Sequence, residues 1–488
     1  MKRPAAFFGG IVALLGSAYI VVHFFAERSG VLAGDFRAFY CAAKIARTGT
    51  NPYLAHALAA CESQKVQAML FTAHAGVVIP APLPGYGIAF FLPFTVLSFG
   101  AAALCWSTVL LGAVVASMLL LRRLTGLPGA LIVAALALSA GLTSLWTGQL
   151  VPIVLLALVA AGWFLRCNKP HAAAIAALVS TIEPHVGLPA CLALFVWCRQ
   201  SRIPLLLGGS VLAAISIALL GVGVNVAYFT KVLPAHIAAD RSNLYQYSLT
   251  WVLHAMGARD GIATLAGELS YAALLVIGVV LARPIARTIH EPAAIVLLPP
   301  ALVLFGGTYM HITQMCLAVP ITLLLLARSA RRYRAVLTVA LAALAIPWLT
   351  LLGSPLTAIL ASVVAAICLR PAIRHERVAL AAMGAVAFFL LGASVWAARL
   401  PHPRLGTASA LAGTSVSASA AWAHALAQNA NAPNTAVYWI MKAPTWLGLL
   451  ALLATVLAIA VERFGGEALF DSRSRSHLRG KFSEGRAS

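Results

Sequence analysis

The sequence has very few acidic residues. Asp and Glu number 13 among 488 residues, against 34 Lys and Arg, which gives a formal net charge of +21. Only 10% of the residues are charged, whereas a soluble domain has about 25%. The remainder is 61% hydrophobic, with a mean hydropathy of +0.93. Apolar runs of about 20 residues recur from end to end. The sequence therefore predicts an all-α, polytopic transmembrane bundle without a soluble domain.

Several signatures of cofactor and metal sites are also absent. The chain has no Asp-x-Asp motif and no Gly-rich turn of the dinucleotide-binding type, so no nucleotide-sugar site is visible. Its eight cysteines include no Cys-x-x-Cys pair and no zinc spacing. No convincing internal repeat is found, although repeated halves are common in transporters. We therefore expect no resident cofactor, and a divalent metal is left open.

The basic residues occur in short loops between the apolar runs. We expect about 12–14 spans, with both termini inside. The expected spans are 6–25, 101–121, 129–146, 149–165, 171–182, 185–198, 203–223, 262–282, 292–308, 312–327, 335–350, 355–369, 378–398 and 443–461. The segments placed inside contain 23 of the 34 basic residues, as the positive-inside rule predicts. This distribution explains the positive charge without any binding of nucleic acid.

Three segments between the spans are long and are placed outside: 26–83, 224–261 and 399–442. The first should contain two interfacial helices, at 36–48 and 54–73. The apolar stretch 84–100 is interrupted by proline and glycine and is expected to dip into the interface. The transmembrane domain is expected to occupy 1–462. The basic tail, 463–488, is expected to be disordered and cytoplasmic.

Two cysteines, Cys41 and Cys61, lie in the first outside segment. An oxidising periplasm would allow a disulfide between them, and the alternative is two free thiols buried between helices. The other six cysteines lie in or beside spans, where packing is the simplest interpretation.

The segment Gly34–Tyr53, GDFRAFYCAAKIARTGTNPY, follows the first span and is the most informative part of the chain. A carboxylate such as Asp35 is costly near lipid and is therefore a functional candidate. The segment resembles the head of the polyprenol-phosphate-mannose-dependent integral-membrane glycosyltransferases of the GT-C superfamily. The resemblance continues more loosely through Gly148-Gln149, Gln246–Leu249 and His311.

This resemblance implies an inverting hexosyltransferase of a bacterial inner membrane, with its active site facing the periplasm. The donor would be a hexose such as mannose on a polyprenyl phosphate, in agreement with the missing nucleotide-sugar motifs. The acceptor would be a lipid or an envelope glycan, and membrane lipids would surround the protein.

Two residues are the catalytic candidates. Asp35 is expected to act as the general base that takes the proton of the acceptor hydroxyl. The alternative is that Asp35 only caps the helix that begins near Phe36. In the resembling family a histidine at the place of His311 lies near the donor phosphate, where it stabilises growing negative charge. The alternative for His311 is an interfacial histidine without a ligand.

Eight further residues are candidates for binding substrate: Arg37, Tyr40, Lys44, Gln149, Glu183, His185, Arg241 and Gln246. Arg241 is the best isolated candidate for a phosphate clamp, because arginine binds phosphate at two points. Glu183 stands where the family has lysine, which favours contact with sugar hydroxyls over contact with phosphate. A metal held by Glu183 and His185 is the alternative, but no third ligand is apparent.

Other classes of protein remain possible from sequence. A transporter or lipid flippase would bind its substrate near the bilayer midplane, whereas these candidates all map to the outer side. A non-catalytic subunit of an envelope assembly complex would not need the outer carboxylate. The common placement of the candidates favours the enzyme.

Overall fold

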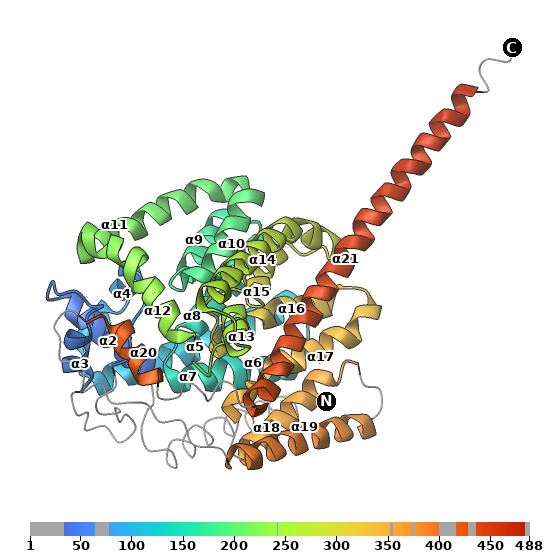
Figure 1. The fold of residues 1–488 in the computed structure, drawn as a ribbon. Helices are drawn as coiled ribbons and strands as arrows, with labels where there is room; N and C mark the ends of the chain where they lie inside the picture. The colour runs from blue at the N-terminus through green and yellow to red at the C-terminus, as the bar shows by residue number, and fades with distance from the viewer. Residues whose placement is uncertain are drawn as a thin grey trace.

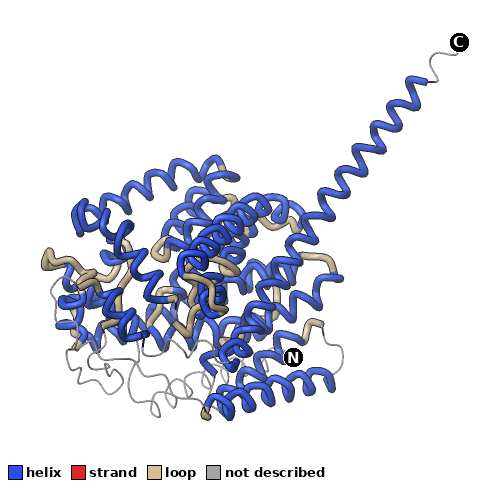
Figure 2. The backbone as a smooth tube through the Cα atoms, in the orientation of Figure 1, coloured by secondary structure: helices blue, strands red, loops and turns tan. Residues whose placement is uncertain are grey.

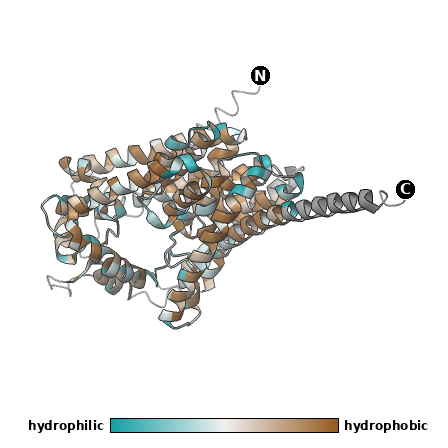
Figure 3. Cartoon of the chain, turned by 90° about the horizontal axis from the view of Figure 1, so that it is seen from above, coloured by the Kyte–Doolittle hydropathy of each residue, from teal (hydrophilic) through white to brown (hydrophobic). Residues whose placement is uncertain are grey.

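The computed structural model describes residues 34–63, 78–241, 243–351, 355–372, 376–399, 416–427 and 436–483. These residues are almost entirely helical and include no β-strand, which confirms the predicted all-α fold (Figure 2). Apolar residues dominate the helices, as Figure 3 shows. The expected first span, 6–25, lies outside the described residues.

By length and composition, four helices of the described chain could cross a membrane. They are α5 (Phe99–Thr125), the helical run Arg199–Asp240, α14 (Asp260–Thr288) and the first part of α21, Ala436–Arg463. Shorter apolar helices accompany them: α6 (Gly129–Leu136) with η2 (Ala137–Leu142) and α7 (Thr143–Thr147), α8 (Val151–Arg166), α9 (Pro170–Ser180), α10 (Pro184–Trp197), α15 (Ala294–Val303), η5 (Ile312–Ala318) with α16 (Val319–Arg328), α18 (Pro355–Leu369) and α19 (Glu376–Ala397). With α17 (Arg334–Ala345), a helix stands at every span predicted from residue 101 onward.

Helices stand where the two interfacial helices were predicted, and residues 64–73 of the second prediction lie outside the described residues. The first outside segment contains α2 (Gly34–Ala46) and α3 (Ala55–Glu62). Between Pro84 and Gly100 the chain forms only α4 (Gly85–Ala89) and η1 (Leu92–Val96) before α5 begins. The prolines at 84 and 93 lack the backbone N–H that a longer helix would need.

An aromatic cluster fixes α2 against the bundle. Phe36 stacks on Trp106 with ring centroids 5.7 Å apart, and Phe91, Phe94 and Phe99 lie within 6.1 Å of its ring. Aromatic side chains of this size bury a large apolar area, so the cluster anchors the helix that begins with the head motif.

A disulfide joins α2 to α3, between Cys41 and Cys61. It decides between the two alternatives that the sequence left open. The bond ties both interfacial helices into one unit next to Asp35.

Successive helices form antiparallel hairpins, because short turns connect α8 to α9 and α14 to α15, and the two members of each pair pack closely. The turns therefore gather at two ends of the bundle. At one end, Arg166 and Arg328 both lie near the Glu291 carboxylate, at 3.6 and 3.8 Å. We call this the basic end. The turns that carry Gln149, Glu183 and His311 belong to the other end, which we call the site end.

A turn within the run Arg199–Asp240 directs its last part back over the site end. Gly221 interrupts α11 (Arg202–Ala227) with φ = 75°, a conformation that favours glycine. Asn225 donates to the carbonyls of Ser216 and Gly221 across this interruption. The chain then continues through the π-helical η4 (Tyr228–Val232) into α12 (Leu233–Asp240), as Figure 1 shows.

The C-terminal part contains two helices, α20 and α21. A short helix, α20 (Ala418–Ala427), lies in the third outside segment and packs against α12. Helix α21 continues from Ala436 to Ser483 and projects from the bundle (Figure 1). The sequence predicts disorder for 463–488, whereas helix α21 reaches Ser483. Its Arg, Lys, Leu and Ala residues are good helix formers, and extending a helix costs less than starting one.

Candidate functional site

One cavity of about 400 Å³ collects five of the ten predicted site residues: Asp35, Gln149, Glu183, His185 and His311. This volume is within the usual range for ligand sites of roughly 300–1,000 Å³. The polar residues that line it are Asp35, Gln149, Glu183, His185, Tyr228, His236, Asp240, Asn243, Tyr271, Thr308, Tyr309, His311, Gln314 and Trp422. They come from segments far apart in the sequence, and apolar side chains form the rest of the wall.

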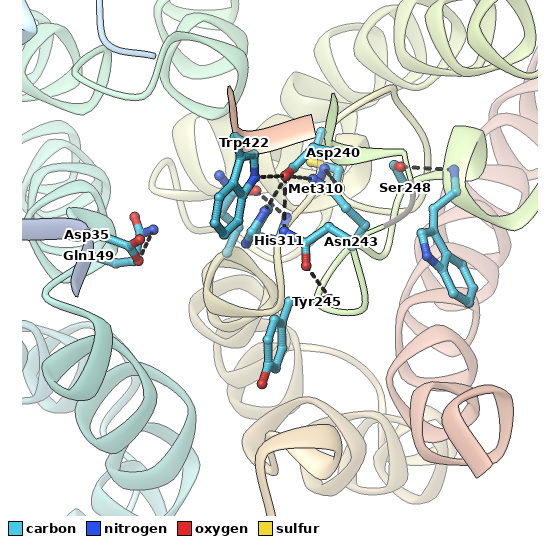
Figure 4. Close-up of polar contacts among 12 residues, drawn as sticks. Asp35, Gln149, Asp240, Asn243, Tyr245, Ser248, Met310, His311 and Trp422 are labelled. Atoms are coloured by element: carbon cyan, nitrogen blue, oxygen red, sulfur yellow. Dashed lines mark hydrogen bonds and ion pairs between the residues drawn. The ribbon is translucent and has the colours of Figure 1, made fainter. Parts of the chain in front are cut away.

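Asp35 lies in the first turn of α2, behind Gly34. Its Oδ2 accepts a hydrogen bond of 2.7 Å from Nε2 of Gln149, and Figure 4 shows the two side chains together. Burial raises the pKa of Asp35 to about 6, although nearby His311 and the Gln149 hydrogen bond act in the opposite direction. The carboxylate is thus held in place by one amide and lines the cavity.

Asp240 is bound much more completely. Its Oδ1 accepts hydrogen bonds from Asn243 at 3.0 Å and Trp422 at 2.9 Å. Its Oδ2 contacts Gln246 at 2.6 Å and Nε2 of His311 at 2.7 Å. With four partners, Asp240 is suited to orient its neighbours, and Figure 4 shows this cluster apart from Asp35.

His311 is held at two points. Besides the contact with Asp240, its ring accepts from the backbone N–H of Gln314, while Gln314 Oε1 accepts from the His311 N–H at 2.9 Å. This capping box starts η5 and fits the neutral ring with its proton on Nε2. Burial lowers the pKa of His311, but the carboxylates of Asp240, Asp35 and Glu183 together outweigh it, so the net pKa is raised.

A short antiparallel bridge brings these residues together. Gln246 pairs with His311 through the backbone, and Tyr247 N–H donates to the Met310 carbonyl at 2.6 Å. The Gln246 side chain also accepts from the Met310 N–H at 2.9 Å. Lys442, fully buried in α21, donates to the Gln246 carbonyl at 2.6 Å. The bridge fixes the loop that carries Asp240 next to the loop that carries His311.

The side chain of Gln314 contacts Glu183, another acidic residue of the cavity wall. Its Nε2 donates to Glu183 Oε2 at 2.9 Å and lies 2.7 Å from His185 Nε2. Because an amide nitrogen only donates, His185 Nε2 must accept and its proton is on Nδ1. Burial raises the pKa of Glu183 to about 7, against the effects of Gln314 and His311.

The structure does not bring all the predicted residues into this cavity. Arg37 lies over the Phe99 ring at 5.1 Å, and the Tyr40 hydroxyl donates to the Leu97 carbonyl at 2.9 Å. Lys44 lies 6.0 Å from the Tyr40 ring. None of these three side chains lines the cavity, because helical phase turns them from the face that carries Asp35.

Arg241 also lies outside the wall, where its guanidinium pairs with Asp260 at 3.1 Å. Because the Arg241 guanidinium is already paired with Asp260, the structure adds no support for the phosphate clamp that the sequence favoured. Gln246 is buried behind Asp240 and orients it, instead of reaching the cavity itself.

Sequence reasoning did not select several residues of the wall: His236, Asn243, Tyr309, Gln314 and Trp422. The four-residue spacing of His236 and Asp240 on one helix face is a signal that could have found the first. Nothing in the sequence points to Trp422, which arrives from α20 by tertiary packing.

The described residues include no group of three His, Cys, Asp or Glu side chains placed to hold a metal ion. The sequence-based alternative of a metal on Glu183 and His185 gains no third ligand from the part of the chain that the structure describes. Gln314 occupies the position between these two side chains.

Comparison with known proteins assigns the chain to a class. No curated protein and no solved structure matches it. Residues 84–305 match the family model of glycosyltransferase family 87, which covers the segment carrying Gln149, Glu183, His185 and Asp240 and ends before His311. The expected resemblance is thus confirmed over these residues, and this similarity to family 87 supports a membrane glycosyltransferase.

Proposed function

We propose that the protein transfers a hexose, such as mannose, from a polyprenyl phosphate to a lipid or envelope-glycan acceptor at the periplasmic face of the inner membrane. Asp35 is the base of this reaction, and the transfer inverts the anomeric carbon. The family match supports the transferase class, and the arguments below support the finer parts of the proposal.

The single observation that carries the proposal is the difference between the two aspartates of the cavity. Asp240 accepts four hydrogen bonds, so its lone pairs are already engaged. Asp35 accepts one, from Gln149, among the described residues. A base must keep a lone pair available for the incoming proton, and Asp35 meets this condition. Its pKa of about 6 leaves it mostly ionised at neutral pH yet basic enough to accept a proton.

The donor, the acceptor and Asp35 together account for every bond and proton in the chemical step. The acceptor oxygen bonds to C1 of the hexose on the face opposite the phosphate, and its proton passes to Asp35. The C1–O bond to the phosphate breaks, and its electron pair stays on the phosphate oxygen. Inversion follows from attack at the opposite face, and one carboxylate in contact with the acceptor is sufficient.

The wall of the cavity suits a donor carried by a lipid. Leu188 on α10 and Phe229 on η4 line the cavity, yet 54% and 64% of these side chains are exposed. They are therefore positioned where the cavity meets the outer surface of the bundle. A polyprenyl chain could remain in the bilayer against such residues while its sugar phosphate enters the cavity.

The charge distribution supports a periplasmic site. The basic end holds the arginine-rich turns, which the positive-inside rule assigns to the cytoplasm. The site end is its opposite. Reporter fusions after Asp240 should give a periplasmic signal, and fusions after Arg332 a cytoplasmic one. A cytoplasmic signal after Asp240 would reverse the assignment.

The direct test is transfer by the purified protein in lipid nanodiscs. A panel of radiolabelled polyprenyl-phosphate hexoses would be incubated with membrane lipid extract, and labelled products separated. We expect transfer from at least one lipid-phosphate donor and none from the matching nucleotide sugars. Transfer from a nucleotide sugar alone would contradict the proposed donor class.

A further inference from the structure

His236 is the least satisfied polar side chain of the cavity. It lies on α12, lines the cavity and is only 5% exposed. Neither ring nitrogen has a hydrogen-bond partner among the described residues. A buried donor or acceptor without a partner costs roughly 1–3 kcal/mol, so such a group calls for an explanation.

The other two histidines of the wall differ from His236 in this respect. His311 is engaged by Asp240 and by the backbone of Gln314. His185 accepts from the Gln314 side chain. All three rings surround Tyr309, at 5.0–5.6 Å between centroids. His236 is the member of this group with neither ring nitrogen bound to another described residue, so both are available to a ligand.

The composition of the wall indicates which ligand group His236 would meet. Among the described residues that line the cavity there is no lysine and no arginine. A sugar phosphate must nevertheless find hydrogen-bond donors for its anionic oxygens. Imidazole N–H groups are the strongest donors that this wall offers. The three rings lie around Tyr309, and His311 contacts Asp240, which Figure 4 shows apart from Asp35.

Resting on the proposed function, we infer that His236 binds the phosphate group of the lipid-linked donor and donates a hydrogen bond to it as the glycosidic bond breaks. The C1–O electron pair passes to the phosphate oxygen, and the imidazole N–H stabilises this charge without itself losing the proton. The sugar then lies between His236 and Asp35, with the acceptor hydroxyl on the Asp35 side. This arrangement separates base and leaving group, as inversion requires.

The π-helical turn before α12 is consistent with this role. Segments of this kind are often found at functional sites, because they re-aim the residues that follow. Here η4 precedes His236 by four residues, and the Gly221 interruption directs both elements over the cavity. The Gly221 interruption and the π-helical turn η4 therefore both contribute to placing the His236 imidazole at the cavity.

The test uses His236→Phe, which keeps an aromatic ring of similar size but removes both nitrogens. Because these nitrogens have no partner within the described protein, we expect the unliganded variant to melt at the wild-type temperature or above it. Its affinity for polyprenyl phosphate, the reaction product, should fall about 10-fold or more, as expected when a hydrogen bond to a charged group is lost. KM for the donor should rise with it, while KM for the acceptor stays unchanged.

Controls separate the phosphate from other causes. His254→Phe removes a histidine of α13 (Leu249–Ala255) that pairs with Asp260 outside the cavity, and it should leave the affinity for polyprenyl phosphate unchanged. The uncharged polyprenol should bind wild type and His236→Phe equally, because it lacks the phosphate. His236→Gln, which restores one donor, should recover part of the affinity.

Each remaining outcome overturns a specific statement. Wild-type affinity in His236→Phe would refute the phosphate role, although transfer by the wild type would still support the proposed function. A His236→Phe protein that unfolds would refute the premise that the ring lacks structural partners. Failure of the wild type to bind polyprenyl phosphate or to transfer from it would refute the proposed function itself.

Discussion

The two ends of the bundle both bury carboxylates, but they neutralise them with different partners. At the basic end, Glu291 lies between Arg166 and Arg328. The same arginines donate to the Leu124 carbonyl, so they also close the C-terminal end of α5. At the site end, amides, an indole and histidines contact the carboxylates.

This difference in partners suits the Glu291 cluster to a structural role and the site end to a chemical one. A guanidinium stays protonated at any ordinary pH, so the Glu291 cluster holds fixed charges and joins three turns. Imidazoles and amides leave the charge at the site end adjustable, since histidine gains or loses a proton near neutral pH. An active site that moves one proton and releases one anion needs the second arrangement.

The largest effect is expected for Asp35→Asn. Asparagine keeps the shape of the side chain and can still bond to Gln149, but it cannot accept the proton of the acceptor hydroxyl. We expect transfer to fall by about 10²–10⁴-fold, with unchanged expression and melting temperature. Asp35→Glu should recover little, because the longer side chain displaces the base. Activity within a few-fold of wild type would return Asp35 to a structural role in α2.

Asp240→Asn should lower both activity and stability, in contrast to Asp35→Asn. The substitution removes the charge that faces His311 and puts an amide N–H against hydrogen-bond donors from Gln246 or Trp422. Leaving a buried donor without its acceptor costs roughly 1–3 kcal/mol, and we expect a clear drop in melting temperature. Turnover should fall about 10²-fold, as should that of His311→Ala. A stable, inactive Asp240→Asn protein would instead make Asp240 a second candidate base.

The pH dependence of transfer should follow Asp35. Its pKa is raised to about 6 by burial, so the base is ionised above pH 6 and protonated below it. We expect kcat/KM to fall about tenfold per pH unit below this value. The fold binds the Asp35 proton more tightly than the unfolded chain does, so protonation between about pH 4 and 6 favours folding at this residue. Melting curves at each pH would show that acid inactivation is not unfolding.

The smallest effect on activity is expected for Glu291→Gln at the basic end. The neutral side chain keeps its size but leaves Arg166 and Arg328 without their carboxylate. Both arginines are about one-third exposed, so water compensates in part, and the melting temperature should fall by only a few degrees. Kinetic constants should stay within about twofold of wild type. A large loss of kcat with normal stability would show that the two ends are coupled.

Much of the fold was predictable because membrane helices depend on local composition. Continuous apolar runs and basic turns fixed the helices from residue 101 onward and the sense in which they alternate. The head motif marked Asp35, and alternation of the spans placed Gln149, Glu183 and His311 at the same end. These are properties of sequence order, so no tertiary contact was needed to find them.

Some of the predicted residues lie outside the cavity, for physical reasons of the opposite kind. Arg241 follows Asp240 directly, yet only Asp240 enters the cavity, because the turn after α12 directs Arg241 to Asp260. Arg37 and Lys44 are close to Asp35 in sequence, but the helix presents them on other faces. Closeness in sequence selected these cations, and side-chain direction excluded them from the cavity.

The sequence by itself determined three things: the membrane-spanning helical class, the concentration of basic residues at one end of the bundle, and the identity of the candidate base. All three depend on composition, order and a local motif. Only the tertiary structure decided that Asp240 accepts four hydrogen bonds while Asp35 accepts one among the described residues. It also decided that Cys41 bonds to Cys61, and that His236 lines the cavity without a hydrogen-bond partner among the described residues. These depend on distances between segments up to hundreds of residues apart. Such distances are set by packing, by the Gly221 interruption and by the bridge between Gln246 and His311.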